Sequence, residues 1–198
     1  MTKRDTNLQQ VLDLSQAIIA ASGHSQAMRA GVRVFERLAA FEGAARSTAA
    51  ERLPVCDGTI GTALAALADR ATPLPELGSA FAEVDGRLRW YRRKASVPSD
   101  EPFYSSHANA MLVGPGGLEE RSDVQVGVTV MPQRMLYPDH DHPPEEVYVA
   151  LSPGEWWNAA MDWTAPGPGG IIYNPPGILH AMRSHADPFL ALWFLPLD

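Results

Sequence analysis

Four side chains able to bind a metal or move a proton recur at even spacing in one short stretch of this chain: His140, His142, Glu146 and Tyr148. Side chains on an extended strand alternate between its two faces, so residues of one parity point the same way. If the stretch is a strand interrupted briefly at Pro143-Pro144, two imidazoles, a carboxylate and a phenol share one face. The opposite parity carries apolar residues that a covering layer would bury: Val147, Val149 and Leu151. This arrangement predicts a first-row metal site with a candidate base beside it.

A second stretch, from Gly169 to His180, supplies one more imidazole. Pro175 and Gly177 suit a tight turn, and His180 follows on the next expected strand. An imidazole from a distant strand would complete the ligand set that His140, His142 and Glu146 begin.

Together the two stretches resemble the two motifs of the cupin superfamily. The first motif requires His-x-His, then Glu and later Gly, which correspond here to His140, His142, Glu146 and Gly154. The second motif requires four residues at fixed spacing, which correspond to Gly169, Pro175, Gly177 and His180. Arg134 stands where the first motif has Gly, and Ser184 stands where the second has Asn. Neither departure removes a ligand, and the resemblance covers roughly the C-terminal half.

Further features narrow the resemblance to the cupin dimethylsulfoniopropionate (DMSP) lyases of the DddQ-like type. Tyr137 lies three residues before His140, Tyr148 follows Glu146 by two, and the N-terminal third reads as entirely helical. The resemblance implies one divalent transition metal (Zn, Fe or Mn) and β-elimination of DMSP to dimethyl sulfide and acrylate. It assigns Tyr148 the role of general base. Related cupins of other activity share the metal residues.

The three histidines and Glu146 favour a metal site over isolated polar residues, because four positions match two spacings. Imidazole and carboxylate ligands suit Zn, Fe, Mn, Co or Ni. The opposite parity of Glu145 predicts a structural or supporting role outside the ligand set.

Tyr148 has two readings, since tyrosine is also a common strand residue that packs in barrel walls. A free phenol has a pKa of about 10, too high for a base near neutrality. A divalent cation close by would favour the phenolate. The predicted position beside Glu146 therefore favours the catalytic reading.

Aromatic residues surround both motifs, and core packing is the default expectation for most of them. A sulfonium is a permanent cation that aromatic faces bind well. We predict that Tyr137, Trp193 and Trp163 contact the substrate, and that Tyr137 also belongs to the catalytic set. The basic run from Arg87 to Lys94 is expected to be a solvated strand and turn, and His107 and His185 to be surface or supporting residues.

The bulk composition is that of one globular domain, with or without a helical appendage: 198 residues, 45% hydrophobic and 20% charged. The net charge of −7 argues against a nucleic-acid partner. The single cysteine, Cys56, excludes an internal disulfide and suits a reducing compartment. No signal segment or stretch of transmembrane length is visible, so we expect a cytoplasmic protein without a membrane partner.

Hydrophobic spacing changes along the chain from helical to alternating. Helices are predicted around residues 8–19, 28–38 and 60–67, ending at Thr72-Pro73-Leu74-Pro75. Strands are predicted at 88–91, 110–113, 124–130 and 189–195, the last buried on both faces. The chain is therefore predicted to be α+β and mainly β. A helical N-terminal segment, residues 1–75, precedes a cupin barrel (double-stranded β-helix or jelly roll) with the metal site, residues 76–198.

The sequence thus predicts a metal-dependent DMSP lyase that is a monomer or a homodimer, with helices that cover the barrel or mediate the dimer and carry no ligand. One alternative is a cupin dioxygenase or isomerase that uses the same ligands on another small substrate. A second is a non-catalytic metal- or ligand-binding cupin, which would leave Tyr148 without a role.

Overall fold

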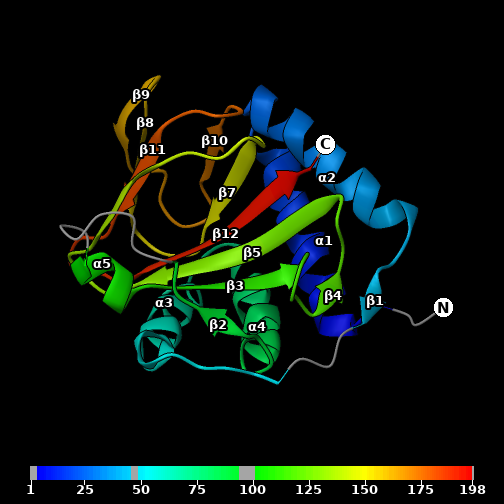
Figure 1. Ribbon diagram of the computed structural model, residues 1–198, viewed down its shortest axis with the longest axis horizontal. Helices are drawn as coiled ribbons and strands as arrows, with labels where there is room; N and C mark the ends of the chain where they lie inside the picture. The colour runs from blue at the N-terminus through cyan, green and yellow to red at the C-terminus, as the bar shows by residue number, and fades with distance from the viewer. Residues whose placement is uncertain (1–3, 46–48, 94–100, 198) are drawn as a thin grey trace.

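A computed structural model describes residues 4–45, 49–93 and 101–197 (Figure 1). Lys94, from the predicted basic run, lies outside the described residues. The helical elements are α1 (Thr6–Ala21), α2 (Ser25–Ala40), a 3₁₀ turn (Pro54–Cys56), α3 (Thr59–Ala65), α4 (Leu74–Asp85) and α5 (Glu101–Ser106). Among the described residues, none of these helices has both the length and the apolar character needed to span a membrane.

The strands form two sheets. The larger contains β1 (Ala44–Ala45), β2 (Trp90–Tyr91), β3 (Ala108–Val113), β4 (Glu119–Glu120), β5 (Val124–Met131), β7 (Glu146–Ala150), β10 (Ile171–Asn174) and β12 (Phe189–Pro196). The smaller has the order β6 (Leu136–His140), β11 (His180–Arg183), β8 (Glu155–Asn158) and β9 (Met161–Thr164). All pairings are antiparallel except β3 with β4. The predicted class, N-terminal helices followed by a cupin-type barrel of two sheets, is confirmed.

The first two helices begin at side-chain caps. The Asp5 carboxylate accepts hydrogen bonds from the backbone N–H groups of Asn7 and Leu8, which starts α1. The His24 ring nitrogen Nδ1 accepts one from the backbone N–H of Ala27, which starts α2. Both helices bury an apolar stripe against the larger sheet.

Strand parity divides the larger sheet into a helix-covered face and an inner face. On β12, one parity joins the core shared with the helices: Leu190, Leu192 and Phe194. The other parity joins a second core between the two sheets: Phe189, Ala191, Trp193 and Leu195. β12 is therefore buried on both faces, as predicted. On β7, Val147 and Val149 face the helices while Tyr148 faces the interior, so the predicted parity is also confirmed.

The end of the helical segment differs from the prediction. Thr72-Pro73-Leu74-Pro75 was expected to end helical structure, but α4 begins at Leu74 and continues to Asp85. Pro75 sits in the first turn, where a backbone N–H would lack an intrahelical partner in any case, so proline is tolerated. The predicted boundary at residue 75 thus falls inside a helix, and the division into two domains stays a prediction.

Candidate metal and substrate site

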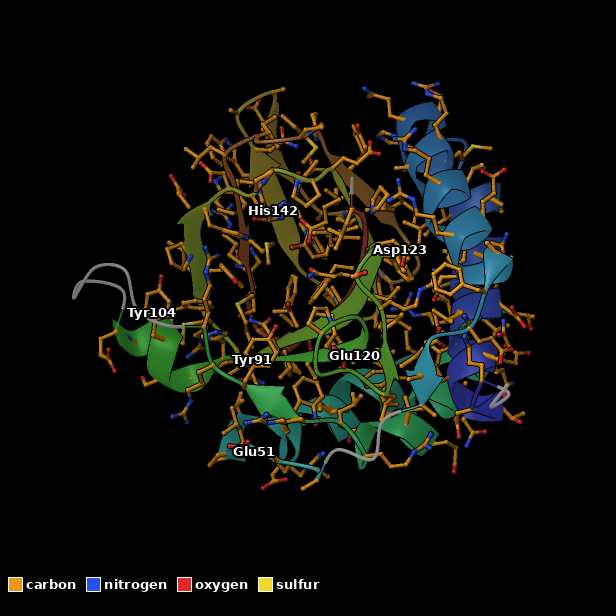
Figure 2. All side chains as sticks on the ribbon, turned by 45° about the vertical axis from the view of Figure 1, so that its right-hand side comes forward. Glu51, Tyr91, Tyr104, Glu120, Asp123 and His142 are labelled. Atoms are coloured by element: carbon orange, nitrogen blue, oxygen red, sulfur yellow. The ribbon has the colours of Figure 1, made fainter. Side chains whose placement is uncertain are left out.

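A cavity of about 430 Å³ opens between the two sheets. The larger sheet contributes Tyr91, Asn109, Gln125, Thr129, Glu146, Tyr148, Trp193 and Leu195 to its wall. The rest comes from β6 and the segments that follow β2, β6 and β12, including Arg93, Tyr137, His140, His142 and Pro144. Tyr91 and His142, both of which line the cavity, are labelled in Figure 2.

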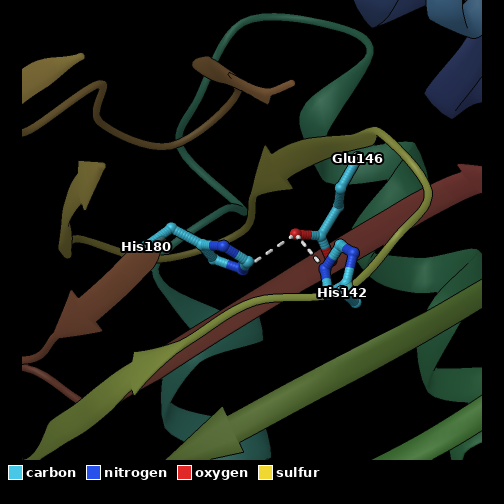
Figure 3. A group of neighbouring side chains, drawn as sticks. All are labelled: His142, Glu146 and His180. Carbon is cyan, nitrogen blue, oxygen red and sulfur yellow. Dashed lines mark hydrogen bonds and ion pairs between the residues drawn. The ribbon is translucent and has the colours of Figure 1, made fainter. Parts of the chain in front are cut away.

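Three of the predicted ligands, two of which line this cavity, converge on one another (Figure 3). One donor atom from each of His142, Glu146 and His180 lies within 4.8 Å of the other two. The Glu146 oxygen Oε2 is 3.3 Å from His142 Nε2 and 3.4 Å from His180 Nε2. The side chains come from the β6–β7 connection, from β7 and from β11, so the fold brings the two sequence motifs together.

Backbone carbonyls orient the imidazoles. The Nδ1 atom of His142 lies 2.9 Å from the carbonyl oxygen of Pro144, and that of His180 lies 2.9 Å from that of Ile178. A carbonyl oxygen can only accept a hydrogen bond, so Nδ1 carries the hydrogen in each ring. In the neutral ring, Nε2 then has a free lone pair that can bind a metal. Carbonyl partners that fix the tautomer in this way are typical of metal-binding histidines.

The donor set fits a divalent cation. His180 Nε2 is fully buried and has no hydrogen-bond partner among the described residues, while the Glu146 carboxylate faces it. A lone pair and a carboxylate held this close repel each other unless a positive charge lies between them. Two imidazoles and one carboxylate suit Zn, Fe or Mn, and the free Cys56 thiol belongs to the helix-side core.

The charges within the cluster are strongly coupled. Burial alone would lower the pKa of His142, but the hydrogen bond to Glu146 and its negative charge raise that pKa above its ordinary value. Burial would raise the pKa of Glu146, but His142 and then His180 lower it. The carboxylate therefore remains charged and attracts a cation, either a proton on His142 or a metal ion.

His140, the fourth predicted ligand, lies next to this cluster. It is paired in register with His180 across β6 and β11, and the two ring centroids are 4.0 Å apart. Its Nδ1 atom lies 3.0 Å from the carbonyl oxygen of Pro138. Burial, followed by the charge of His180, lowers the pKa of His140 to about 3. His140 is thus a neutral imidazole beside the three-residue cluster.

Tyr148 lies two residues after Glu146 on the inner face of β7 and lines the cavity. Burial, and then the negative charge of Glu146, raise the pKa of Tyr148 well above its ordinary value. The protein groups around it therefore favour the protonated phenol. A phenolate here requires a positive charge such as a metal ion close to the ring oxygen.

Tyr137 also lines the cavity. Its ring stacks on His140 with a centroid distance of 4.3 Å, and its hydroxyl oxygen accepts a 3.4 Å hydrogen bond from Arg93 Nη1. Burial raises the pKa of Tyr137, although Arg93 acts in the opposite direction. The tyrosine therefore lies between a candidate ligand and a fixed positive charge.

Comparison with known proteins identifies the family. A family model described as dimethylsulfoniopropionate lyase matches residues 26–191. The chain belongs to the DMSP lyase family. It is similar to the DMSP lyase DddQ of Ruegeria pomeroyi, with 37% identity over 93 residues, which is 46% of this chain and 45% of that protein. The matched segment thus spans about half the length of this relative.

Solved structures of DMSP lyases share the fold over nearly the whole chain. A crystal structure reported as that of the DMSP lyases RdDddP and RnDddQII aligns with a TM-score of 0.68 and 20% identity, covering 96% of this chain and 92% of that one. That of DddQ from Ruegeria pomeroyi DSS-3 aligns with a TM-score of 0.63 and 23% identity, covering 98% and 93%. Both alignments include the helices as well as the barrel, so the fold is shared, and the family match over residues 26–191 confirms the predicted resemblance to DMSP lyases.

Of the predicted substrate-binding residues in this DMSP lyase family member, Tyr137 and Trp193 line the cavity. Trp163 does not appear among the described residues that line it. Trp163 belongs to β9, at the edge of the smaller sheet, and its ring lies under the Arg183 guanidinium at 4.1 Å. The expectation that Trp163 contacts substrate is therefore corrected: the ring packs against a cation on its own sheet.

Glu145 has the supporting position that its parity predicted. Its carboxylate is paired with Arg33 of α2 and accepts a 2.8 Å hydrogen bond from the Tyr173 hydroxyl. Both contacts lie on the helix side of β7, away from the ligand cluster. Glu145 therefore ties α2 to the sheet.

Two residues of this DMSP lyase family member take positions that the sequence prediction described only in part. Arg93 is exposed, as expected, but it also lines the cavity and reaches the Tyr137 hydroxyl. His107 was expected at the surface or in support, but it is fully buried, and its Nε2 accepts a 2.9 Å hydrogen bond from the Arg93 backbone N–H. Sequence parity could have indicated the position of Arg93. Tyr91 and Arg93 are two residues apart, so they point to the same side of an extended segment, and both line the cavity.

Proposed function

We propose that this chain is a metal-dependent DMSP lyase that forms dimethyl sulfide and acrylate by β-elimination. One observation carries the proposal: in a chain of this family, the donor atoms of His142, Glu146 and His180 converge, and Tyr148 lines the same cavity as His142 and Glu146. The cavity volume of about 430 Å³ suits a small substrate of this kind.

The proposed metal ligands are His142, Glu146 and His180, with His140 as a neighbouring fourth candidate. When bound, a divalent cation supplies positive charge for the substrate carboxylate and favours the phenolate of a nearby tyrosine. Zn, Fe and Mn are all compatible with these ligands.

Tyr148 is the proposed general base. Its phenolate oxygen takes the proton from C2 of the substrate, and the electrons of the broken C–H bond form the C2–C3 double bond. The C3–S bond breaks, and its electrons leave with sulfur as neutral dimethyl sulfide. The leaving group needs no proton, so a single base is sufficient for the elimination.

The ends of the substrate differ in charge, and the cavity offers a different wall to each. The aromatic faces of Trp193 and Tyr137 suit the sulfonium, which is a permanent cation. The ligand cluster and Arg93 suit the carboxylate. Trp163 lies outside the proposed substrate site, because it does not line the described cavity.

The test is release of dimethyl sulfide into the headspace over purified protein given DMSP. Separate samples are loaded with Zn, Fe or Mn, and metal-stripped protein is the control. We expect dimethyl sulfide and acrylate in equal amounts with at least one metal and almost none after stripping. Absence of dimethyl sulfide release with all three metals would contradict the proposal. Oxygen consumption and isomerisation of other small substrates would then be the activities to measure.

A further inference from the structure

A chain of hydrogen bonds runs along the cavity wall through Thr129 and Asn109, which the proposed mechanism does not use. The Trp193 indole N–H donates to Thr129 Oγ1 over 3.2 Å, and the Thr129 hydroxyl donates to Asn109 Oδ1 over 2.6 Å. Asn109 also lines the cavity together with Tyr137, and it lowers the pKa of Tyr137 against the effect of burial. Since its Oδ1 accepts from Thr129, the Asn109 amide nitrogen is the polar group left to act on the Tyr137 hydroxyl.

Strand register places these groups together. Asn109 and Thr129 are directly opposite each other on β3 and β5, and Trp193 of β12 is paired with Gly127 of β5. A Cβ atom at Gly127 would lie 2.1 Å from the Trp193 ring, so the indole occupies the space that a side chain would fill. Gly127 therefore supplies room for the ring, and Thr129 supplies the bond that fixes its rotation.

The chain of hydrogen bonds within the larger sheet ends at Asn109, whose side chain acts on Tyr137 of the smaller sheet. Trp193 belongs to the larger sheet and Tyr137 to the smaller, and both rings line the same cavity. Arg93 approaches the Tyr137 hydroxyl as a further donor, at 3.4 Å. Thr129 thus fixes one of the two rings proposed to bind the sulfonium, and Asn109, hydrogen-bonded to Thr129, acts on the other.

Asn109 and Thr129 form a buried polar pair that needs hydrogen-bond partners in order to be stable. Asn109 and Thr129 are 7% and 2% exposed, and apolar side chains could fill the same volume without the need for hydrogen-bond partners. Attraction between a cation and an aromatic face depends on a ring distance within about 6 Å and on facing geometry. Fixing both rings therefore controls the affinity for a cation.

We propose that Asn109 and Thr129 are positioning residues that hold the Trp193 and Tyr137 rings at the spacing that selects the sulfonium end of the substrate. This inference rests on the proposed lyase function. It assigns specificity to residues that do not react, and it predicts a selective effect on ligands that carry the cation.

The first test compares Thr129→Val, which keeps the shape but loses the hydroxyl, with Thr129→Ser, which keeps the hydroxyl. We expect Thr129→Val to raise KM for DMSP by roughly threefold to thirtyfold, the range of a lost cation–π contact, with kcat nearly unchanged. Thr129→Ser should stay near the wild type. Inhibition by acrylate, which has a carboxylate but no sulfonium, should be unaffected in both variants.

A parallel loss of DMSP and acrylate affinity in Thr129→Val would overturn the inference, because a general distortion of the cavity affects both ligands. An unchanged KM for DMSP would overturn it as well. Asn109→Leu provides a second variant that breaks the link at another point, and the same selective loss is expected. It carries the test if Thr129→Val does not fold.

A spectroscopic readout separates this inference from the lyase proposal. In protein labelled with ¹⁵N on its indoles, the Trp193 signal is assigned by its absence in Trp193→Phe. We expect that signal to shift in Thr129→Val and to stay in place in Thr129→Ser, whether or not the protein releases dimethyl sulfide. If the wild type shows no lyase activity, the Trp193 indole signal is followed while DMSP is added. A wild-type signal that does not respond to DMSP would refute the proposed sulfonium site.

Discussion

His180 lies directly opposite His140 on neighbouring strands, and the two imidazole centroids are 4.0 Å apart. The pair joins the second sequence motif to the first, because β11 and β6 are hydrogen-bonded neighbours in the smaller sheet. Two imidazoles this close cannot both be protonated without strong repulsion. Neutral imidazoles beside the Glu146 carboxylate are the arrangement that the proposed metal site requires.

The ligand assignment predicts which substitutions remove the metal. We expect His142→Ala and His180→Ala to lose most of the bound divalent metal, because each removes one of the three converging donors. His140→Ala should lose less, since its ring lies beside the cluster. Elemental analysis of the purified proteins measures the effect.

His185→Ala is the matched control for this prediction. His185 is an exposed histidine that pairs with Glu155 at 3.0 Å, away from the cluster, so its loss should leave the metal content unchanged. Full retention of metal in both His142→Ala and His180→Ala would show that the ligand assignment is wrong.

Tyr148→Phe should keep the fold and the metal but lose most of the elimination activity. The substitution removes one oxygen and leaves the buried ring, so packing changes little. A general base contributes on the order of 10²–10⁴-fold, and the loss should appear in kcat rather than in KM alone. Steady-state release of dimethyl sulfide is the measurement, and Tyr137→Phe should show a milder loss. Near wild-type turnover in Tyr148→Phe would remove the proposed mechanism.

Local sequence pattern was sufficient to predict most of the ligand cluster. Parity alone places Glu146 and Tyr148 on one face of β7, with Val147 and Val149 on the other, because strand geometry fixes that relationship within a few residues. Alternation likewise predicted β5, and a continuous apolar run predicted β12 as a strand buried on both faces. The two-sheet barrel follows from several such strands with turns between them.

Features that depend on long-range register could not be predicted in this way. Arg93 reaches the cavity because β2 pairs with β3 and because buried His107 binds the Arg93 backbone, two contacts that no local pattern encodes. Trp163 does not line the described cavity, because β9 is the edge strand of the smaller sheet. Its aromatic character was visible in the sequence, but its distance from the ligands was not.

Arg93 is expected to assist substrate binding through its charge. Arg93→Gln should raise KM for DMSP by about twofold to tenfold, because a partly solvated cation contributes modestly to carboxylate binding. The effect should shrink at high salt. Arg92→Gln is the matched control, since Arg92 is exposed and does not line the described cavity. Equal effects of the two substitutions would indicate general charge rather than a specific contact.

The N-terminal helices are expected to stabilise the fold without taking part in turnover. Leu12 on α1 is 1% exposed within the core shared with the sheet, so Leu12→Ala should lower the free energy of unfolding by about 2–5 kcal/mol. Glu36→Gln, on the exposed face of α2, should leave kcat and assembly unchanged. Urea unfolding, kinetics and gel filtration measure these effects, and the last also distinguishes a monomer from a homodimer. Loss of turnover in Glu36→Gln with folding and assembly intact would contradict this view.

His107 should make the protein less stable in acid. Burial is the main cause that lowers the pKa of His107 to about 4, from an ordinary value of 6.5. The unfolded chain therefore takes up a proton below pH 6.5 while the folded protein does not, so stability falls as the pH drops from 6.5 to about 4. The shift corresponds to a loss on the order of 3 kcal/mol.

The His107→Gln variant isolates this contribution. Glutamine does not titrate, so metal-free His107→Gln should lose less stability than metal-free wild type between pH 7 and pH 4.5, although it starts from a lower value at pH 7. Starting stability falls because His107 donates to the Phe103 carbonyl oxygen and accepts from the Arg93 backbone N–H, a geometry that glutamine reproduces imperfectly. Urea midpoints at the two pH values give the comparison. An identical pH dependence in both proteins would mean that His107 is protonated in the folded state without cost, which its full burial between Phe103 and the Arg93 backbone argues against.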